Sequence, residues 1–313
     1  MKIRPFKQVD VFTAVPYLGN PLAVVLEGDG LSTEDMQHFA QWTNLSETSF
    51  VLPPTPEGLA AGADYRVRIF TPTTELPFAG HPTLGTCYAW LQANPEQQAK
   101  TEFLQECAVG LIKIQRNPET QRLAFAAPAL KRSTPSPELL SQITQALGLH
   151  PPQIIAAQIL DNGPAWFSLL LDSADTVLQL SPDHAQLKAL GQKVGVAAVE
   201  QAEPATSLIA RSNREARAFG VRSPTNQGAQ TAPELEVRAF AAAVGVIEDP
   251  VTGSLNASLA QWLIADGHMP SAYTASQGLN LGRAGRVHIT QDDHGQVWVG
   301  GDVVTCINGT VAL

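Results

Sequence analysis

Three short segments of the chain combine acidic, imidazole and glycine residues in patterns that can do chemistry. They are Asn44–Phe50, Leu76–Pro82 and Ile247–Ser254. The first contains Glu47 at the start of an apolar, strand-like run. If apolar neighbours exclude water from this carboxyl, its pKa rises and it becomes a usable general acid and base near neutral pH. The alternative interpretation is an ordinary solvated turn residue.

The other two segments each place a glycine, Gly80 or Gly253, near the start of an apolar run that predicts a helix. Helix N-termini carry unpaired N–H groups and the positive end of the helix dipole, and glycine lets a ligand approach the backbone. Two such termini facing one cleft would bind a carboxylate. The alternative is that these residues only begin helices, with Asp249 as an N-cap and with Pro82 and Pro250 as first helical residues.

The elements around these segments occur twice, which predicts a duplicated chain. The alternating run Tyr65–Phe70 matches Leu235–Phe240, and each is followed by a loop and a strongly apolar helix. A helix that is apolar nearly all round is usually buried. We therefore predict an α/β (α+β) fold of two lobes, each a bent, mostly antiparallel sheet wrapped around a central helix. The active site is expected in the cleft between the lobes.

The same reading predicts where the lobes begin and end. The N-terminal lobe is expected at 1–128, completed by 300–313, and the C-terminal lobe at 129–299. The stretch 130–137 is expected to be a loop that joins them, and 212–233 an inserted surface loop. Each lobe is also expected to contain an outer helix, with Ser32 and Ser181 as the N-cap residues.

Bulk composition limits the class of protein. The 313 residues exceed the roughly 250–300 at which a single core stops growing, and the net charge of −9 argues against nucleic acid as a partner. The three cysteines show no disulfide or zinc-ligand spacing. The N-terminus lacks the apolar core of a signal peptide, and no apolar run approaches the ~20 residues that span a bilayer. We expect a cytoplasmic protein with no membrane partner and no bound metal.

Five segments, in order along the chain, resemble the signature of the PhzF-like (phenazine biosynthesis) family, which shares its fold with diaminopimelate epimerase. The resemblance implies a homodimeric isomerase that moves a proton on a small anionic carboxylate without metal or organic cofactor. The reaction would be like that of trans-2,3-dihydro-3-hydroxyanthranilate isomerase. The segments are Asn44–Thr48, Phe70–Pro72, Glu75–Gly85, Glu248–Ser254 and Gln277–Arg283.

The resemblance also implies roles for single residues. Glu47 would be the proton shuttle, and His81 and Asp249 would assist it, with Asp249 near the substrate amine. The residues predicted to bind substrate are Asn20, Gly80, Gly253, Ser254 and Gln277.

The number of acid/base groups separates two mechanisms. An epimerase of the related type uses one cysteine on each face of the substrate, but here the nearest cysteine, Cys87, lies inside the first apolar helix. The stretch 193–199, which corresponds to the Glu47 region, contains no carboxylate. One carboxylate favours proton transfer on a single face. Two alternatives stay open: an epimerase or racemase with Asp249 or His81 as second base, and a non-catalytic ligand-binding protein.

Overall fold

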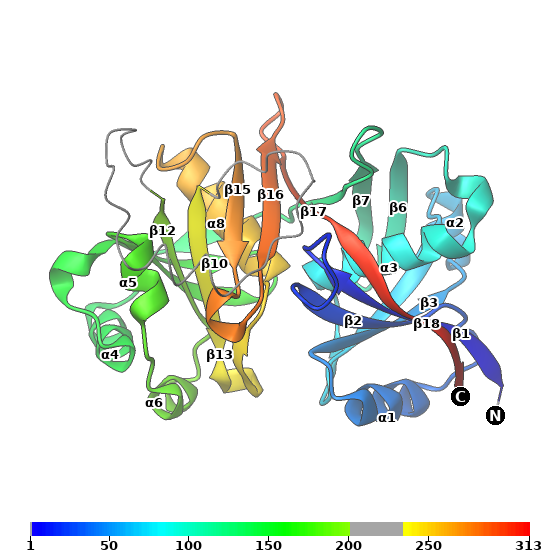
Figure 1. Ribbon diagram of the computed structural model, residues 1–313, viewed down its shortest axis with the longest axis horizontal. Coiled ribbons are helices and arrows are strands. Elements are labelled where there is room, and N and C mark those ends of the chain that lie inside the picture. The colour runs from blue at the N-terminus through cyan, green and yellow to red at the C-terminus, as the bar shows by residue number, and fades with distance from the viewer. Residues whose placement is uncertain (1, 201–233) are drawn as a thin grey trace.

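The computed structural model describes residues 2–200 and 234–313, so the insertion expected at 212–233 lies outside the described residues. Two halves lie side by side, as Figure 1 shows. The N-terminal half contains β1 to β8, with helices α1 (Thr33–Thr43), α2 (Pro56–Ala60) and α3 (Gly80–Ala93). Its strands are β1 (Ile3–Val11), β2 (Asn20–Val25), β3 (Glu47–Leu52), β4 (Tyr65–Phe70), β5 (Glu75–Leu76), β6 (Glu102–Cys107), β7 (Gly110–Arg116) and β8 (Leu123–Ala126).

The C-terminal half repeats this arrangement around its own central helix. Its helices are α4 (Pro137–Leu147), α5 (Ala174–Gln179), α6 (His184–Ala189) and α8 (Gly253–Ala265). Its strands are β9 (Lys131–Ser133), β10 (Ile154–Asp161), β11 (Ala165–Leu171), β12 (Val194–Val199), β13 (Leu235–Ala241), β14 (Val246–Asp249), β15 (Ala272–Gln277), β16 (Gly285–Gln291) and β17 (Val297–Gly301). The last strand, β18 (Val303–Ala312), returns to the first half.

Hydrogen bonds link the strands of both halves into one continuous, strongly bent sheet. Pairs β2–β3 and β4–β6 are parallel in the first half, β11–β12 and β13–β15 are parallel in the second, and the remaining pairs are antiparallel. The halves join where β8 pairs with β17 in an antiparallel register. The predicted architecture of two duplicated lobes, each a mostly antiparallel sheet around a central helix, is confirmed.

The chain crosses between the halves twice. After β8 it enters β9, which pairs with β10 of the second half. After β17 it enters β18, which pairs with β1 along its length, from Ile3 opposite Ala312 to Val11 opposite Val303. The prediction that 130–137 is only a loop is therefore wrong, because three of its residues form a sheet strand. Figure 1 shows the red C-terminal strand beside the blue N-terminal strands.

The two central helices are buried almost all round, as their apolar composition predicted. They begin at Gly80 and Gly253 and not at the prolines. Pro82 is the third residue of α3, and Pro250 lies before α8. Asp249 ends β14, so its interpretation as a helix N-cap is wrong; the N-cap residue of α8 is Thr252.

The outer helices follow ordinary capping chemistry. Ser32 caps α1 in a complete capping box with Asp35, as expected. Ser181 does not cap its helix. Asp183 accepts the Gln186 N–H at 2.9 Å instead and begins α6. A carboxylate is at least as good an N-cap acceptor as a hydroxyl, and here it stands directly before the helix.

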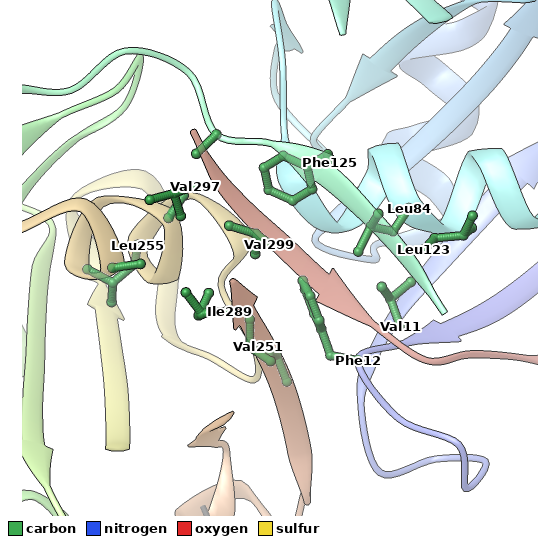
Figure 2. Close-up of a cluster of buried hydrophobic side chains, with 14 of the residues drawn as sticks. Val11, Phe12, Leu84, Leu123, Phe125, Val251, Leu255, Ile289, Val297 and Val299 are labelled. Carbon is green, nitrogen blue, oxygen red and sulfur yellow. The ribbon is translucent and has the colours of Figure 1, made fainter. Parts of the chain in front are cut away.

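One large hydrophobic cluster extends from one half into the other. Buried side chains of α3 and β8 contact those of β17 and α8 without interruption (Figure 2). Phe12 fills the junction, with its ring against the backbone of Gly301, where a Cβ atom would lie 2.4 Å from the ring. The junction is thus held by apolar packing and by the β8–β17 hydrogen bonds, which fixes the ends of the central helices relative to each other. Among the described residues, no helix is both long and apolar enough to cross a bilayer.

A matched arginine–glutamate pair stabilises the hairpin that leads into each central helix. Arg68 donates to both carboxylate oxygens of Glu75, at 2.8 and 2.6 Å. Arg238 does the same to Glu248, at 2.9 and 2.9 Å. We call these the two arginine clamps. Bidentate geometry holds both atoms of each carboxylate, so each hairpin is fixed in orientation as well as in position.

The clamps also define which residues of the two halves correspond. Each clamp arginine lies over a phenylalanine two residues later, Phe70 at 5.1 Å and Phe240 at 4.9 Å from the ring centroid. Phe70 is paired with Thr48 of β3, and Phe240 is paired with Val194 of β12. Thr48 and Val194 therefore occupy equivalent sheet positions.

Candidate active site

Glu47 is the first residue of β3, where the strand emerges beside the N-terminus of α3. Its side chain is only 17% exposed, and its Oε2 lies 3.4 Å from Nε2 of His81. Desolvation raises the pKa of Glu47 to about 7, and a hydrogen bond from the neighbouring Ser46 offsets part of this rise. A carboxyl in this environment exchanges a proton near neutral pH.

His81 is the second residue of α3, and its side chain is 5% exposed. Burial lowers its pKa to about 4, although Asp249 and Asp10 oppose the shift, so the imidazole is neutral at pH 7. Its Nδ1 lies 3.4 Å from the Asn20 amide nitrogen, which can only donate. The proton of the neutral ring then belongs on Nε2, facing Glu47.

Asn20 connects the two halves at this point. Its Nδ2 donates to Asp249 Oδ1 at 3.0 Å and to the Val251 carbonyl at 2.9 Å, and its Oδ1 accepts from Ser46 at 3.4 Å. The side chain is completely buried. Asn20 was predicted to bind substrate; its geometry favours a positioning role, because its amide is occupied by protein groups from both halves.

Asp249 lies on the second-half side of this network. Its Oδ2 accepts from the Thr252 hydroxyl at 2.7 Å. Desolvation raises the pKa of Asp249 to about 6, and the charge of Glu47 adds to the rise, while His81 and its hydrogen bonds oppose it. Two carboxyl groups with raised pKa values thus share one small region.

Gln277 holds the backbone that carries Asp249. Its Oε1 accepts the Thr252 N–H at 3.0 Å, and its Nε2 donates to the Asp249 carbonyl at 3.0 Å and to the Thr252 hydroxyl at 2.9 Å. The side chain is completely buried. Gln277 therefore has no free polar group for the ligand contact predicted from the sequence, and it acts on the site through Asp249 and Thr252.

Gly80 and Gly253 bring the two central helices into contact at their N-termini. A Cβ atom on Gly80 would lie 3.0 Å from the Gly253 Cα and 2.8 Å from the ring of Phe125. A Cβ on Gly253 would lie 3.0 Å from the Gly80 Cα. Neither helix has a side-chain cap. The glycines are thus required for helix contact, and the free N–H groups of both first turns meet in one place.

Ser254 is the second residue of α8. Its Oγ accepts from the Trp166 indole nitrogen at 3.2 Å, and its carbonyl accepts from Asn162 at 3.0 Å. The structure thus gathers the predicted residues of the catalytic group, Glu47 with His81 and Asp249, around Asn20. Within the part of the chain that the structure describes, no cluster of three or more His, Cys, Asp or Glu side chains is arranged to hold a metal ion.

Sequence reasoning missed several residues of this site. Ser46 is one of them, although it stands beside Glu47 in a motif that was noted. Thr252 and Asn256 were also missed, and both contact Gln277. Trp166 was noted only as part of a strand. No local sequence signal links Trp166 to α8, because the contact spans 88 residues of chain.

Comparisons with known proteins agree with the fold of the chain. Residues 9–309 match the family model described as phenazine biosynthesis-like protein. The chain is 34% identical to antisense-enhancing sequence 1 of Schizosaccharomyces pombe over 97% of each chain. It is 31% identical to trans-2,3-dihydro-3-hydroxyanthranilate isomerase of Pseudomonas aeruginosa, over 92% of this chain and 90% of that one. A PhzF family protein of Bacillus anthracis has the same fold, with a TM-score of 0.77, 23% identity and full coverage of both chains.

The fold and the site therefore define a duplicated enzyme of the epimerase-like α/β class. The chain belongs to the phenazine biosynthesis-like (PhzF) family. The expected enzyme class, an isomerase of that family, agrees with the names of its relatives.

Proposed function

We propose that this protein is a cofactor-independent isomerase that moves a proton between carbon atoms of a small carboxylate, with Glu47 as general acid and base. The observation that carries the proposal is the Glu47 carboxyl, whose pKa is raised to about 7 and whose Oε2 faces the neutral His81 ring. Such a group takes a proton as carboxylate and returns it as carboxylic acid within the same pH range.

The proposed reaction is a prototropic shift on one face of the substrate. The Glu47 carboxylate removes a proton from carbon, and the C–H electron pair forms a new C=C bond. The electrons of the existing C=C bond then take a proton from the Glu47 carboxylic acid at a second carbon. His81 Nε2–H orients the carboxylate of Glu47, and Asp249 orients an amine or hydroxyl of the substrate.

The substrate carboxylate is proposed to bind where the N-termini of the two central helices meet. Gly80 and Gly253 meet there, both first turns lack side-chain caps, and Ser254 follows directly. Backbone N–H groups at two helix ends favour an anion, and they also stabilise negative charge that develops during proton transfer. The homodimer and the cytoplasmic location stay predictions from the sequence.

The proposal is tested by hydrogen exchange in heavy water. We would incubate the enzyme with trans-2,3-dihydro-3-hydroxyanthranilate, the named substrate of the relatives, and follow deuterium incorporation by NMR. E47Q should lower exchange by about 100- to 10,000-fold, because general acid/base catalysis contributes about 10²–10⁴-fold. Ligand binding should change little, since glutamine keeps the shape of the side chain.

The matched control is E27Q, which neutralises an exposed carboxyl paired with Lys2. It should exchange at the wild-type rate. Wild-type exchange in E47Q would exclude Glu47 as the proton shuttle. Absence of exchange in wild type with this compound would direct the same assay to a panel of small amino and hydroxy acids.

A second candidate function is epimerisation, and one observation favours it. Desolvation raises the pKa of Asp249 to about 6, which makes this carboxyl a possible second base. The two functions differ in stereochemistry. An epimerase inverts a chiral carbon and loses activity equally in E47Q and D249N, whereas the one-base isomerase retains partial exchange in D249N.

A further inference from the structure

The second half of the molecule has a lysine where the first half has its acid/base glutamate. Thr48 and Val194 occupy equivalent sheet positions, because each pairs with the phenylalanine of its arginine clamp. The residue before Thr48 is Glu47, and the residue before Val194 is Lys193. Lys193 is therefore the duplicated counterpart of Glu47, with the opposite charge.

The surroundings of Lys193 follow the same plan as those of Glu47. Glu47 faces His81, the second residue of α3. The Lys193 Nζ lies 5.3 Å from the ring centroid of Trp166, and the indole N–H of Trp166 donates to Ser254, the second residue of α8. The lysine thus contacts the indole ring that hydrogen-bonds the second residue of α8, whereas the glutamate contacts the second residue of α3 directly.

The ammonium group of Lys193 has no paired carboxylate within the described residues. It makes no hydrogen bond there and no ion pair within 4.0 Å, although it is partly buried over the indole ring. Asp161 attracts it only from a longer distance, and one oxygen of Asp161 accepts the Gly163 N–H. Burial lowers the pKa of Lys193 despite this attraction. A cation in this setting is stabilised by an anion that arrives with a ligand.

Asn162 provides a second, independent sign of an incomplete site. Its side chain is 6% exposed, and Nδ2 donates to the Ser254 carbonyl. Its buried Oδ1, in contrast, has no hydrogen-bond partner in the described chain. A buried acceptor without a partner is costly, and a hydroxyl or amine of a ligand would satisfy it.

We infer that Lys193 is a specificity-determining residue, which selects small substrates with an acidic group on the second-half side of the site. Asn162 would accept a hydrogen bond from a hydroxyl or amine of the same molecule. This inference rests on the proposed function, because it assigns a specificity-determining residue to the same site.

The test compares acids with their neutral amides. Calorimetry would measure the binding of benzoate, anthranilate and 3-hydroxyanthranilate, and of the three corresponding carboxamides, to wild type, K193M and K193R. Wild type should prefer at least one acid over its amide. K193M should weaken the binding of that acid by about 10- to 100-fold, which is the range of one charge-assisted hydrogen bond. Its affinity for the amide should stay within about two-fold of the wild-type value. K193R should keep the preference.

Two further variants make the result decisive. K188M removes an exposed lysine of α6 in the same half and should leave every affinity unchanged. K193Q is the second neutral variant, to be used if K193M does not fold. An equal loss for acid and amide in the neutral variant would overturn the inference, as would a wild type without any preference for an acid. A wild type that shows no acid preference but normal Glu47-dependent exchange would fault this inference alone, because the exchange assay tests the proposed function separately.

Discussion

Glu47 Oε2 and His81 Nε2 lie 3.4 Å apart, and neither atom makes any hydrogen bond within the described residues. Burial acts on the two groups in opposite directions, because it raises the pKa of the acid to about 7 and lowers that of the imidazole to about 4. Near pH 5.5 the carboxyl is therefore protonated, while the imidazole ring is neutral. The pair is neutral where exposed groups would form an ion pair, which keeps the proton available to a substrate.

The Ser46 hydroxyl should set the lower pH limit of activity. Its hydrogen bond favours the ionised form of Glu47, so its loss in S46A raises the pKa of that carboxyl further. The acid limb of the pH profile of kcat/KM should move to higher pH, and activity at pH 6 should fall about two- to ten-fold. S46T, which keeps a hydroxyl, should resemble wild type. An acid limb that moves to lower pH in S46A would contradict this assignment.

The raised pKa of Glu47 should also appear in stability. A folded pKa near 7, against 4.5 in the unfolded chain, means that the folded state binds more protons between these values. This proton binding stabilises the folded state by at most about 3 kcal/mol. The stabilisation is complete below pH 4.5 and is lost as the pH rises through 7. The free energy of unfolding, measured by urea titration, should therefore increase for E47Q relative to wild type between pH 5 and pH 8. Parallel curves for the two proteins would show that Glu47 is not desolvated.

The helix contact at Gly80 and Gly253 should not tolerate a methyl group. G80A and G253A each place a Cβ 3.0 Å from the opposite Cα, which forces the helices apart. Overpacking of this kind lowers the free energy of unfolding by about 1–3 kcal/mol. The exchange rate of the folded variants should also fall, because the helix N–H groups are displaced. G309A is the control, since a Cβ there meets nothing within 4 Å. Thermal unfolding and exchange rates would be measured together; full activity in both site variants would exclude the contact from the function.

The two arginine clamps have the same geometry but should differ in energy. Side chains of Arg238 and Glu248 are 5% and 7% exposed, whereas those of Arg68 and Glu75 are 24% and 36% exposed. R238M leaves a buried carboxylate unpaired and should cost about 3–5 kcal/mol. R68M should cost about 1 kcal/mol or less, because water replaces the lost partner. Equal losses in denaturant titrations of the two variants would mean that burial is not what strengthens the second clamp.

The duplication and the central helices could be predicted from the sequence, because they depend on local patterns. Alternating strands such as Tyr65–Phe70 and an apolar helix after each of them specify burial on their own. Glu47, His81 and Asp249 were predicted from motifs, and the structure places them around Asn20. The helix starts were misplaced by a few residues, since proline indicates a boundary without distinguishing the third helical residue from one before the helix.

The remaining features depend on contacts between residues that are far apart in the chain. The pairing of β9 with β10 of the second half depends on contacts between distant parts of the chain, for which no local pattern exists. The correspondence of the stretch 193–199 with the Glu47 region was predicted from the sequence, but the alignment of Lys193 with Glu47 itself comes from the strand register. Burial then assigned the protonation of Glu47 and His81, because desolvation is a property of the assembled site. Local sequence patterns thus indicated which chemical groups this protein has, and the packing of its two halves fixes which of those groups meet.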